Sequence, residues 1–399
     1  MAAANGKTRL NGPLRYAHIT GWGMAVPETV MTNDDLAAIV ETNDEWIRSR
    51  TGIRERRIAN ERESSATLGY KAATAALEVA DVLPMDIDLI VVATSTSEHV
   101  FPSTANRIQD WLGASKSGAF DLAAACAGFV YAVNMAAQSI RSGSINTALV
   151  IGAETMSRVV DWNDRSTCIL FGDGAGAVVL QGSDQEGGVL SAVLRSDGAG
   201  HDLLSIPTQN VRELNGHRLG KMSMHGGEVF KFATRVVDES IRQVSQDSGI
   251  TLNEIDLIIP HQANYRILQS AARKLGLDMD KFVSNLDRYG NTSAASIPIA
   301  LCEAIEQGRI RKDDHLVMVG FGGGLSWAAM TVRWGIPEPS SLQANPLNRQ
   351  RRRAVYALAR IRARWNRLRR AWSNILRWSN PRNIRLMRLR RRANREKLP

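Results

Sequence analysis

Cysteine is scarce in this sequence, with three residues (Cys126, Cys168 and Cys302) among 399. So few cysteines exclude a disulfide-stapled scaffold and favour a reducing compartment such as the cytoplasm. No uninterrupted apolar run reaches the roughly 18 to 20 residues of a membrane-spanning helix, and the N-terminal segment lacks the apolar core of a signal peptide. A composition of 44% hydrophobic and 23% charged residues is typical of a globular protein, with length enough for two ordinary domains or one large duplicated one.

Acidic residues are almost absent from the end of the chain. Residues 349–399 contain 18 Arg, one Lys and one Glu, which gives a net charge of +18. The first 348 residues hold 31 basic and 39 acidic residues, which gives −8. The overall charge of +10 therefore describes neither part, and the acidic body and the basic tail need separate explanations.

One pattern of strands and helices occurs twice. Ile87–Ala93 and Ile255–Pro260 are short apolar runs that share an Asp-Leu-Ile triplet, and we expect both to be buried strands. A distinctive residue, Cys126 in one half and Asn291 in the other, follows the triplet by 35 to 38 residues and precedes a helix rich in small residues. Two similar halves of alternating strands and helices predict an α/β fold with sheets covered on both faces. The two small-residue helices are expected to pack against each other in the middle.

Shorter patterns predict single elements. They are a strand over Tyr16–Ala25, a helix N-cap in Thr32–Asp35, helices over Ser65–Leu83 and Ala127–Ile140, and strands over Thr147–Gly152 and His315–Gly320. Gly172–Ala177 is rich in glycine, but it lacks the spacing of a phosphate loop and leads directly into an apolar run. We expect a tight turn there rather than a nucleotide site.

The stretch Asp121–Phe129, which reads DLAAACAGF, places Cys126 just before a predicted helix. The unpaired N–H groups and the dipole at a helix N-terminus favour a thiolate over a thiol. Small neighbours also leave room for a substrate. The alternative is a small core residue, because free cysteines are often buried.

Three other polar groups lie at the ends of apolar elements. His261 ends the strand Leu257–Pro260, where the sites of open α/β sheets lie, although a structural histidine fits the position equally well. Asn291 is either part of a site or a helix N-cap. Gly322–Gly324 either points N–H groups into a cavity or forms a turn between two strands. With Cys126, these groups form a Cys/His/Asn set in an α/β duplication.

Four motifs, DLAAACAGF, HQAN, RYGNTSAAS and GFGGG, occur in this order, and over about Tyr16–Gly335 the chain resembles 3-oxoacyl-[acyl-carrier-protein] synthase III. This family is the β-ketoacyl synthase III branch of the thiolase-fold condensing enzymes. The resemblance implies two α/β halves in a thiolase-like, duplicated five-layer α-β-α-β-α sandwich, and a homodimer. It implies condensation of an acyl-CoA primer with malonyl-acyl carrier protein, which gives 3-oxoacyl-carrier protein, CoA and CO2 and starts type II fatty acid synthesis. It implies no metal or redox cofactor.

The resemblance also implies roles for single residues. Cys126 resembles the nucleophile that takes the acyl group, and its N–H and that of Gly323 resemble the oxyanion hole. His261 and Asn291 resemble the pair that donates hydrogen bonds to the malonyl thioester carbonyl, where decarboxylation makes an enolate. A thiolase is disfavoured, because the other two cysteines lie in apolar stretches without a matching motif.

Contacts with the two substrates follow from the same resemblance. Trp46 lies in a segment dense in charge, which is either a CoA-binding region, with the ring stacked on adenine, or a solvated surface with one anchoring aromatic. The implied CoA-binding residues are Trp46, Arg50, Arg165, Gly226 and Asn264. The implied acyl pocket contains Phe101, lent across the dimer, and Phe321. The implied carrier-protein contacts are Gln262, Arg266, Arg273 and Lys274, among which the basic residues suit an acidic partner.

The end of the chain departs from the family. Residues 336–348 form a predicted linker, and residues 349–399 an Arg-rich tail. Apolar residues recur in the tail at steps of three and four: Val355, Leu358, Ile361, Trp365, Leu368, Trp372 and Ile375. This spacing predicts an amphipathic helix that ends before Pro381, with a second basic stretch over Arg382–Arg395. The tail has three candidate partners: an anionic membrane surface, an acidic protein surface and nucleic acid. The acidic protein surface could be the carrier protein or the enzyme's own body. No folded nucleic-acid motif supports the third candidate.

We therefore expect an N-terminal half over 16–183 with the nucleophile, a C-terminal half over 184–335 with His261 and Asn291, the linker and the tail. The expected enzyme is cytoplasmic, and the tail makes it a candidate for peripheral attachment to a membrane. One alternative is a related thiolase-fold synthase that makes a secondary metabolite or joins two acyl chains, which would differ in its pocket. Another is a tail-driven binding protein with a silent synthase body, against which the intact Cys/His/Asn set argues.

Overall fold

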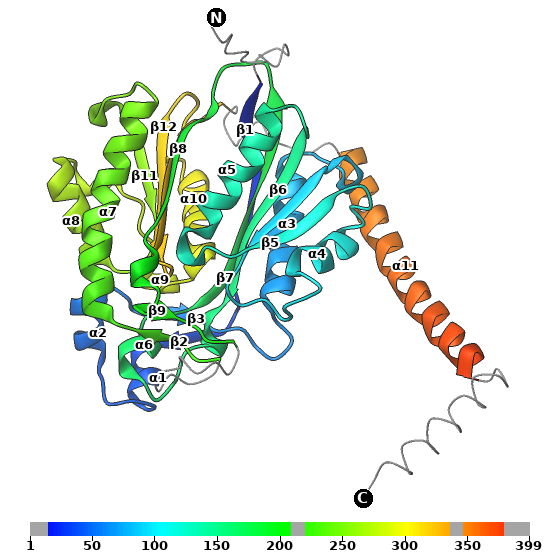
Figure 1. The fold of residues 1–399 in the computed structure, drawn as a ribbon, viewed down its shortest axis with the longest axis horizontal. Coiled ribbons are helices and arrows are strands. Elements are labelled where there is room, and N and C mark those ends of the chain that lie inside the picture. Colours follow the sequence, from blue (N-terminus) through cyan, green and yellow to red (C-terminus); the bar gives the residue numbers. More distant parts are fainter. Residues whose placement is uncertain (1–14, 209–219, 336–345, 379–399) are drawn as a thin grey trace, which may run out of the picture.

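The structure, a computed structural model, describes residues 15–208, 220–335 and 346–378. Figure 1 shows two sheets with helices between them and outside them, and one long helix that stands away from this body. The second basic stretch of the tail, predicted over Arg382–Arg395, lies outside the described residues.

The first sheet has five strands in the order β1-β7-β6-β4-β5. β4 pairs in parallel with β5 and β6, while β7 is antiparallel to β6 and to β1. Its strands span β1 Tyr16–Ala25, β4 Leu89–Ala93, β5 Gly118–Leu122, β6 Thr147–Thr155 and β7 Asp173–Ser183. β5 ends the order and so lies at an edge of this sheet.

The second sheet repeats this arrangement with four strands in the order β11-β12-β13-β8. β11 is parallel to β12, and β13 is antiparallel to both of its neighbours, as β7 is in the first sheet. Its strands span β8 Gly188–Ser196, β11 Leu257–Pro260, β12 His315–Gly322 and β13 Ser326–Arg333. The same order of strand directions in both sheets is the structural form of the repeat predicted from the two Asp-Leu-Ile strands.

Two helices lie between the sheets, and others cover the outer faces. The inner pair is α5 (Gly128–Arg141) and α10 (Ser296–Glu306), whose apolar side chains join both sheets in one core. α3 (Ser65–Val79) and α4 (Thr104–Leu112) cover the first sheet, and α7 (Gly226–Asp247) and α8 (Tyr265–Leu275) cover the second. The layers therefore alternate α-β-α-β-α (Figure 1), as the predicted fold class requires.

Smaller elements complete the body. They are α1 Asn33–Ala37, α2 Asp44–Thr51, α6 Arg165–Cys168 and α9 Leu286–Tyr289, with the short strand pairs β2 Val30–Thr32 with β3 Glu55–Arg57, and β9 Leu204–Ser205 with β10 Ser223–Met224. Thr32 caps α1 as predicted, and its side chain and that of Asp35 form a capping box.

Local predictions agree with the structure except where tertiary contacts intervene. β1 has the predicted bounds, but α3 ends four residues before Leu83, since Asp81 takes a left-handed conformation with φ of 52°. The turn predicted over Gly172–Ala177 is wrong, because β7 begins at Asp173. The glycines there allow close packing instead: a Cβ on Gly176 would lie 2.7 Å from the Cβ of Pro298 on α10.

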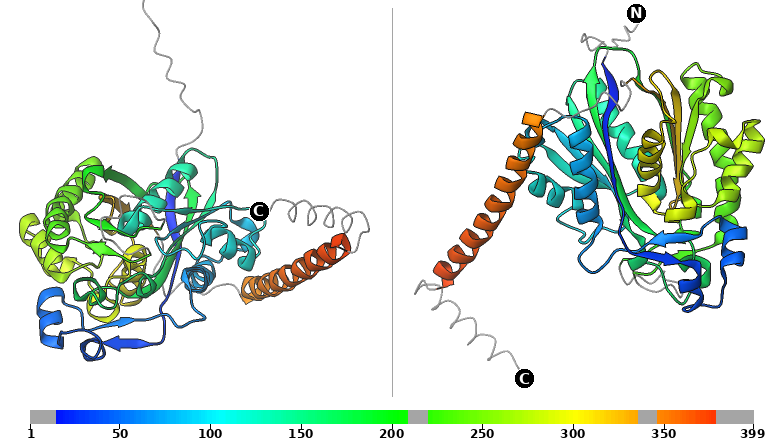
Figure 2. Two further views of the ribbon diagram at one scale, coloured as in Figure 1. Left: turned by 60° about the horizontal axis from the view of Figure 1, so that its bottom comes forward. Right: turned by 180° about the vertical axis from the view of Figure 1, so that it is seen from behind.

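The predicted tail helix is present as α11 (Pro346–Trp378), which begins three residues before the predicted start of the tail. The three views in Figures 1 and 2 show its first turns against α4 and the rest of the helix leaving the body. Among the described residues, no helix is long and apolar enough to cross a bilayer.

Candidate active site

Cys126 lies at the junction between the halves. It sits in a short 3-10 turn (Ala125–Ala127) just before α5, and its side chain is 6% exposed. Ala125 has a φ of 45°, which turns the backbone sharply into the helix. A Cβ on Gly322, at the end of β12, would lie 3.1 Å from the Cys126 Sγ and 2.9 Å from its backbone N. Only a glycine lets the β12 backbone approach the thiol this closely.

The N-terminal end of α10 meets the N-terminal end of α5 at this thiol. Ser293, in the 3-10 turn (Ser293–Ala295) before α10, lies with its Oγ 3.4 Å from the Cys126 Sγ. Its backbone N–H donates to the Asn291 Oδ1 at 2.8 Å, so the Asn291 side chain is oriented by the same turn. Asn291 therefore does not cap α10, which begins five residues later, and the two helix N-termini point at a single site.

Glu154, at the C-terminal end of β6, is a buried carboxylate that the sequence patterns did not identify. Its Oε1 accepts a hydrogen bond from the Ser293 Oγ at 3.1 Å, which links it through one hydroxyl to the cysteine. It also accepts hydrogen bonds from the Thr94 and Thr96 hydroxyls and from the Ser95 N–H. Burial raises the pKa of Glu154 to about 7 against these hydrogen bonds. A lone acidic residue in an otherwise apolar strand was the available signal.

His261 follows β11 directly and is 1% exposed. Its backbone N–H donates to the Val319 carbonyl at 2.8 Å, and its ring meets that of Phe321 edge-on, with centroids 5.1 Å apart. The Nδ1 atom is 2.7 Å from the Oγ of Ser296, the first residue of α10. Burial lowers the pKa of His261 to about 3, so the imidazole is neutral at physiological pH.

The Ser296 hydroxyl also bears on which nitrogen of the neutral imidazole carries the hydrogen, because it is the hydrogen-bond partner of Nδ1. The Ser296 Oγ accepts a hydrogen bond from the Gln262 backbone N–H at 3.4 Å. When the Ser296 hydroxyl donates to the Nδ1 atom of His261, the hydrogen of the neutral ring is on Nε2. Ser293 thus contacts both Cys126 and Asn291, and Ser296 contacts His261. Because the two serines lie in one short segment, the three predicted catalytic residues lie around the same turn.

The electrostatics of Cys126 differ from the sequence-based expectation. Burial raises the pKa of the thiol to about 12, and the hydrogen bond to Ser293 lowers it only in part. The helix N-terminus is where it was predicted, and burial of the thiol acts against the effect expected from it.

Two arginines contact the ring of Trp46. The guanidinium carbon of Arg50 is 5.0 Å from the ring centroid, and that of Arg165 is 5.1 Å away. Asn264, the N-cap of α8, donates from Nδ2 to the Arg50 carbonyl at 3.1 Å and so ties α2 to α8. Gly226 begins α7, and a Cβ at this position would lie 3.6 Å from its nearest neighbouring atom, so the backbone here is open on its Cα side. Four predicted CoA-binding residues thus form a connected cationic and aromatic surface.

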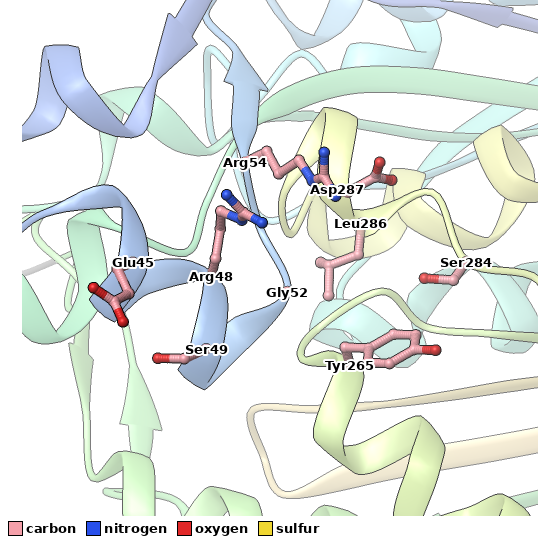
Figure 3. Close-up of a pocket in the computed structure, with 9 residues that line it drawn as sticks. All are labelled: Glu45, Arg48, Ser49, Gly52, Arg54, Tyr265, Ser284, Leu286 and Asp287. Atoms are coloured by element: carbon pink, nitrogen blue, oxygen red, sulfur yellow. The ribbon is translucent and has the colours of Figure 1, made fainter.

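A surface pocket of about 590 Å³ lies beside α2. Figure 3 shows Arg48 and Arg54 facing it from one side, with Asp287 and Tyr265 on the other. Its lining includes none of Cys126, His261 and Asn291, so it is separate from the cysteine site.

The other predicted site residues differ in exposure. Gln262 is 1% exposed and its Nε2 donates to two backbone carbonyls, and its contact with a carrier protein stays a prediction. Arg266 and Arg273 are exposed on α8, while Lys274 is ion-paired with Asp238 at 2.9 Å. Phe101 is 85% exposed in a loop, and Phe321 is buried on the His261 ring. Gly323 follows Gly322, and a Cβ there would lie 3.7 Å from the Cβ of Ala125.

A duplicated five-layer sandwich with a buried cysteine at the junction of its halves defines a thiolase-like condensing enzyme, and comparisons with known proteins agree. Residues 120–198 match the family model of 3-oxoacyl-[acyl-carrier-protein] synthase III, and residues 245–334 match its C-terminal model. β-Ketoacyl-[acyl-carrier-protein] synthase III of Symbiobacterium thermophilum is 53% identical over 327 residues, which cover 99% of that protein and 81% of this chain.

Solved structures give the same result. The crystal structure of 3-oxoacyl-[acyl-carrier-protein] synthase III from Aquifex aeolicus VF5 is 45% identical, with a TM-score of 0.75, over 79% of this chain and 99% of that one. The corresponding synthase III from Thermus thermophilus is 43% identical, with a TM-score of 0.77, over 80% and 99%. This chain belongs to the 3-oxoacyl-[acyl-carrier-protein] synthase III family.

Proposed function

We propose that this protein condenses an acyl-CoA primer with malonyl-acyl carrier protein and so initiates type II fatty acid synthesis. The observation that carries this proposal is the meeting of Cys126, Asn291 and His261 around the N-terminal turn of α10. Relatives about 50% identical over their whole length carry the name of the initiating synthase. An acyltransferase of this family needs a nucleophile and donors for an oxyanion, and these residues supply both.

In the first half-reaction, the Cys126 sulfur attacks the thioester carbonyl of the primer and CoA leaves as the thiol. The negative charge that develops on the carbonyl oxygen is held by the N–H groups of Cys126 and Gly323. The Trp46 surface, with Arg50 and Arg165, binds the adenine and phosphates of CoA. The thioester on Cys126 stores the acyl group, because a thiolate is also a good leaving group.

In the second half-reaction, the malonyl thioester loses CO2 and its enolate oxygen accepts hydrogen bonds from His261 Nε2 and Asn291 Nδ2. A neutral imidazole with its hydrogen on Nε2 is the donor that this step needs, and burial together with Ser296 keeps His261 in that form. The carbanion then attacks the acyl group on Cys126, the carbon–sulfur bond breaks, and the sulfur takes up a proton as the 3-oxoacyl product forms. No step in this sequence uses a metal or a redox cofactor.

The proposal includes the partners. The exposed Arg266 and Arg273 on α8 suit an acidic acyl carrier protein. A homodimer would pair the edge strand β5 with that of a second copy, and the adjacent loop offers Val100 and Phe101, which are 90% and 85% exposed, to the acyl pocket of the second copy. The enzyme acts in the cytoplasm.

The experiment that tests this function is a condensation assay with malonyl-carrier protein and a panel of acyl-CoAs. Wild type and Cys126→Ala are compared, and the protein is weighed by mass spectrometry after exposure to each primer. We expect one acyl adduct on wild type, none on the variant, and 3-oxoacyl-carrier protein from wild type alone. Absence of an adduct with every primer would refute the proposal.

A further inference from the structure

The root of α11 is fixed to the body of the enzyme. Arg352 is 2% exposed and its Nη1 pairs with the Asp81 carboxylate at 2.7 Å. Tyr356 is 6% exposed and packs edge-on against Tyr70, with ring centroids 6.5 Å apart. Arg349 adds an ion pair to Glu78 at 2.6 Å. The direction in which α11 leaves the body is therefore set by buried contacts beside α3.

The apolar residues of α11 past its root are exposed, although Leu358 also borders a pocket that Gly113 of the body lines. Five of them are between 55% and 65% exposed: Leu358, Ile361, Trp365, Leu368 and Trp372. At about 100° per residue, they occupy a sector of about 80° on the helix. Another set of α11 residues contacts the body, and its mean direction around the helix axis is about 140° from the middle of the apolar sector. These residues are Asn348, Arg352, Val355, Tyr356 and Ala359. α11 therefore has an inner face that docks on the body and a separate outer face that is apolar and that no described residue covers.

Charge and position favour a lipid surface as the occupant of the outer face. Arg362 and Arg369 are exposed beside the apolar sector, in a tail of net charge +18 on a body of −8. Apolar residues that include tryptophan, bordered by arginine, match the interface of an anionic bilayer. The carrier protein fits less well, because α11 extends from the α3–α4 side whereas α2 and α8, which carry the CoA and carrier contacts, lie on the other side in Figures 1 and 2.

We propose that α11 is a membrane-docking arm that lays its outer apolar face into the interface of an anionic lipid bilayer. The arginines contact lipid phosphates while the tryptophans and aliphatic residues enter the interfacial region. Because the root is fixed, docking holds the synthase body at the membrane surface with its CoA-binding side turned elsewhere. This inference does not depend on the proposed reaction.

Vesicle flotation of the full-length chain tests the arm. We expect binding to phosphatidylglycerol/phosphatidylcholine vesicles to be at least about tenfold tighter than to phosphatidylcholine alone, and to weaken with salt. Ile361→Glu should reduce binding at least about tenfold. Ile39→Glu is the matched control, since Ile39 is 47% exposed and lies beyond α1, and it should bind as wild type does. Condensation activity in the absence of vesicles should be unchanged in both variants.

Three results would overturn the lipid assignment. The first is equal binding of the wild-type chain to anionic and neutral vesicles, and the second is undiminished binding by Ile361→Glu. The third is absence of vesicle binding, with the outer face needed instead for self-association or for binding carrier protein or nucleic acid. Because activity is measured on the same samples, failure of the arm and failure of the proposed synthase function are distinguishable.

A second inference concerns Glu154, and it rests on the proposed acylation of Cys126. The resting thiol has to lose its proton as the carbon–sulfur bond forms. The Cys126 thiol donates a hydrogen bond to the Ser293 Oγ at 3.4 Å, and the Ser293 hydroxyl donates to the Glu154 Oε1 at 3.1 Å. The geometry points to a relay in which the proton passes from Cys126 to Ser293 while the proton of Ser293 passes to Glu154.

The relay balances over the half-reaction. Sulfur–carbon bond formation at Cys126 leaves one proton on Glu154. When the bond to CoA breaks, that proton returns through Ser293 to the departing sulfur, so the products are the acyl-enzyme and CoA thiol. Glu154 acts through Ser293 and does not touch the substrate. A pKa of about 7 suits both directions of this transfer at neutral pH.

The pH profile of acylation, followed by mass spectrometry, tests the relay. We expect an ascending limb near pH 7 in wild type that disappears in Ser293→Ala and Glu154→Gln, with each variant about 10²- to 10⁴-fold slower. The double variant should be no slower than either single one. Thr94→Val is the control, because it removes a different hydrogen bond to the same carboxylate and should keep the limb. A limb that survives in Ser293→Ala, or additive losses in the double variant, would refute the relay. Alkylation of Cys126 by iodoacetamide over the same pH range gives a second readout without substrate.

Discussion

Removal of the Ser296 hydroxyl tests whether one hydrogen bond selects the working form of His261. The bond joins the Ser296 Oγ to the Nδ1 atom at 2.7 Å, and both residues are at most 2% exposed. In Ser296→Ala, Nδ1 is left buried without this partner. The imidazole then shifts toward the tautomer with its hydrogen on Nδ1, which takes the donor away from Nε2.

The expected size of the effect follows from burial. A buried polar group left without a hydrogen bond costs about 1 to 3 kcal/mol. At about 1.4 kcal/mol for each factor of ten, decarboxylation of malonyl-carrier protein should slow by about 5- to 150-fold. Acylation of Cys126 does not use the Nε2 donor in the proposed sequence, so its rate should change by less than about threefold.

The assay measures the two half-reactions separately. Release of CO2 from malonyl-carrier protein reports on the His261 step, and the mass of the acyl-enzyme reports on the Cys126 step. Ser296→Thr is the control, because it keeps the hydroxyl and should retain most of the decarboxylation rate. Equal slowing of both half-reactions in Ser296→Ala, or an unchanged rate of CO2 release, would refute the reasoning.

Further predictions concern binding, the thiol, pH and the tail. Trp46→Ala should raise KM for the acyl-CoA about tenfold with little change in kcat, measured by steady-state kinetics, because it removes the ring that two guanidinium groups contact; an unchanged KM would contradict the CoA assignment. Cys126→Ala should still release CO2 from malonyl-carrier protein while forming no acyl-enzyme, and loss of both would contradict separate roles for the two half-reactions. Glu154 has a folded pKa of about 7 against an ordinary value of 4.5, so the folded state holds a proton that the unfolded state has lost between these values. The free energy of unfolding should therefore fall by about 3 kcal/mol as pH rises through this window; denaturant titrations should show this slope reduced in Glu154→Gln, and an equal slope would contradict the shift. Deletion of residues 346–399 should leave condensation intact in solution, and loss of activity in a well-folded truncation would contradict that expectation.

Much of the fold could be predicted from local patterns. β1 has the predicted bounds, and α5 begins within one residue of its predicted start, because alternation and helical spacing of apolar residues are properties of neighbouring positions. The helical part of the tail follows for the same reason, since its apolar spacing is continuous over more than five turns. The errors lie where distant contacts decide: the glycines before Val178 serve the packing of α10 rather than a turn.

The candidate site was predictable in its residues but not in its electrostatics. Cys126, His261 and Asn291 stand in short motifs, and motifs name the atoms that do the chemistry. The partners that set their state are distant in sequence: Glu154 is 139 residues from Ser293, and His261 is 35 residues from Ser296. Patterns of neighbouring residues do not predict contacts between residues so far apart in the sequence.

By itself, the sequence determined the repeated α/β halves, the identity of the reactive thiol and the amphipathic character of the tail, since each depends on residue type and spacing. Only the tertiary structure shows that burial raises the pKa of Cys126 and lowers that of His261. Both follow from desolvation, which arises when the two halves close over the site. The tertiary structure likewise decided that one side of α11 is bound to the body, which leaves the opposite apolar face exposed within the described part of the chain. Periodicity shows that a helix has an apolar face, but only packing shows what covers it.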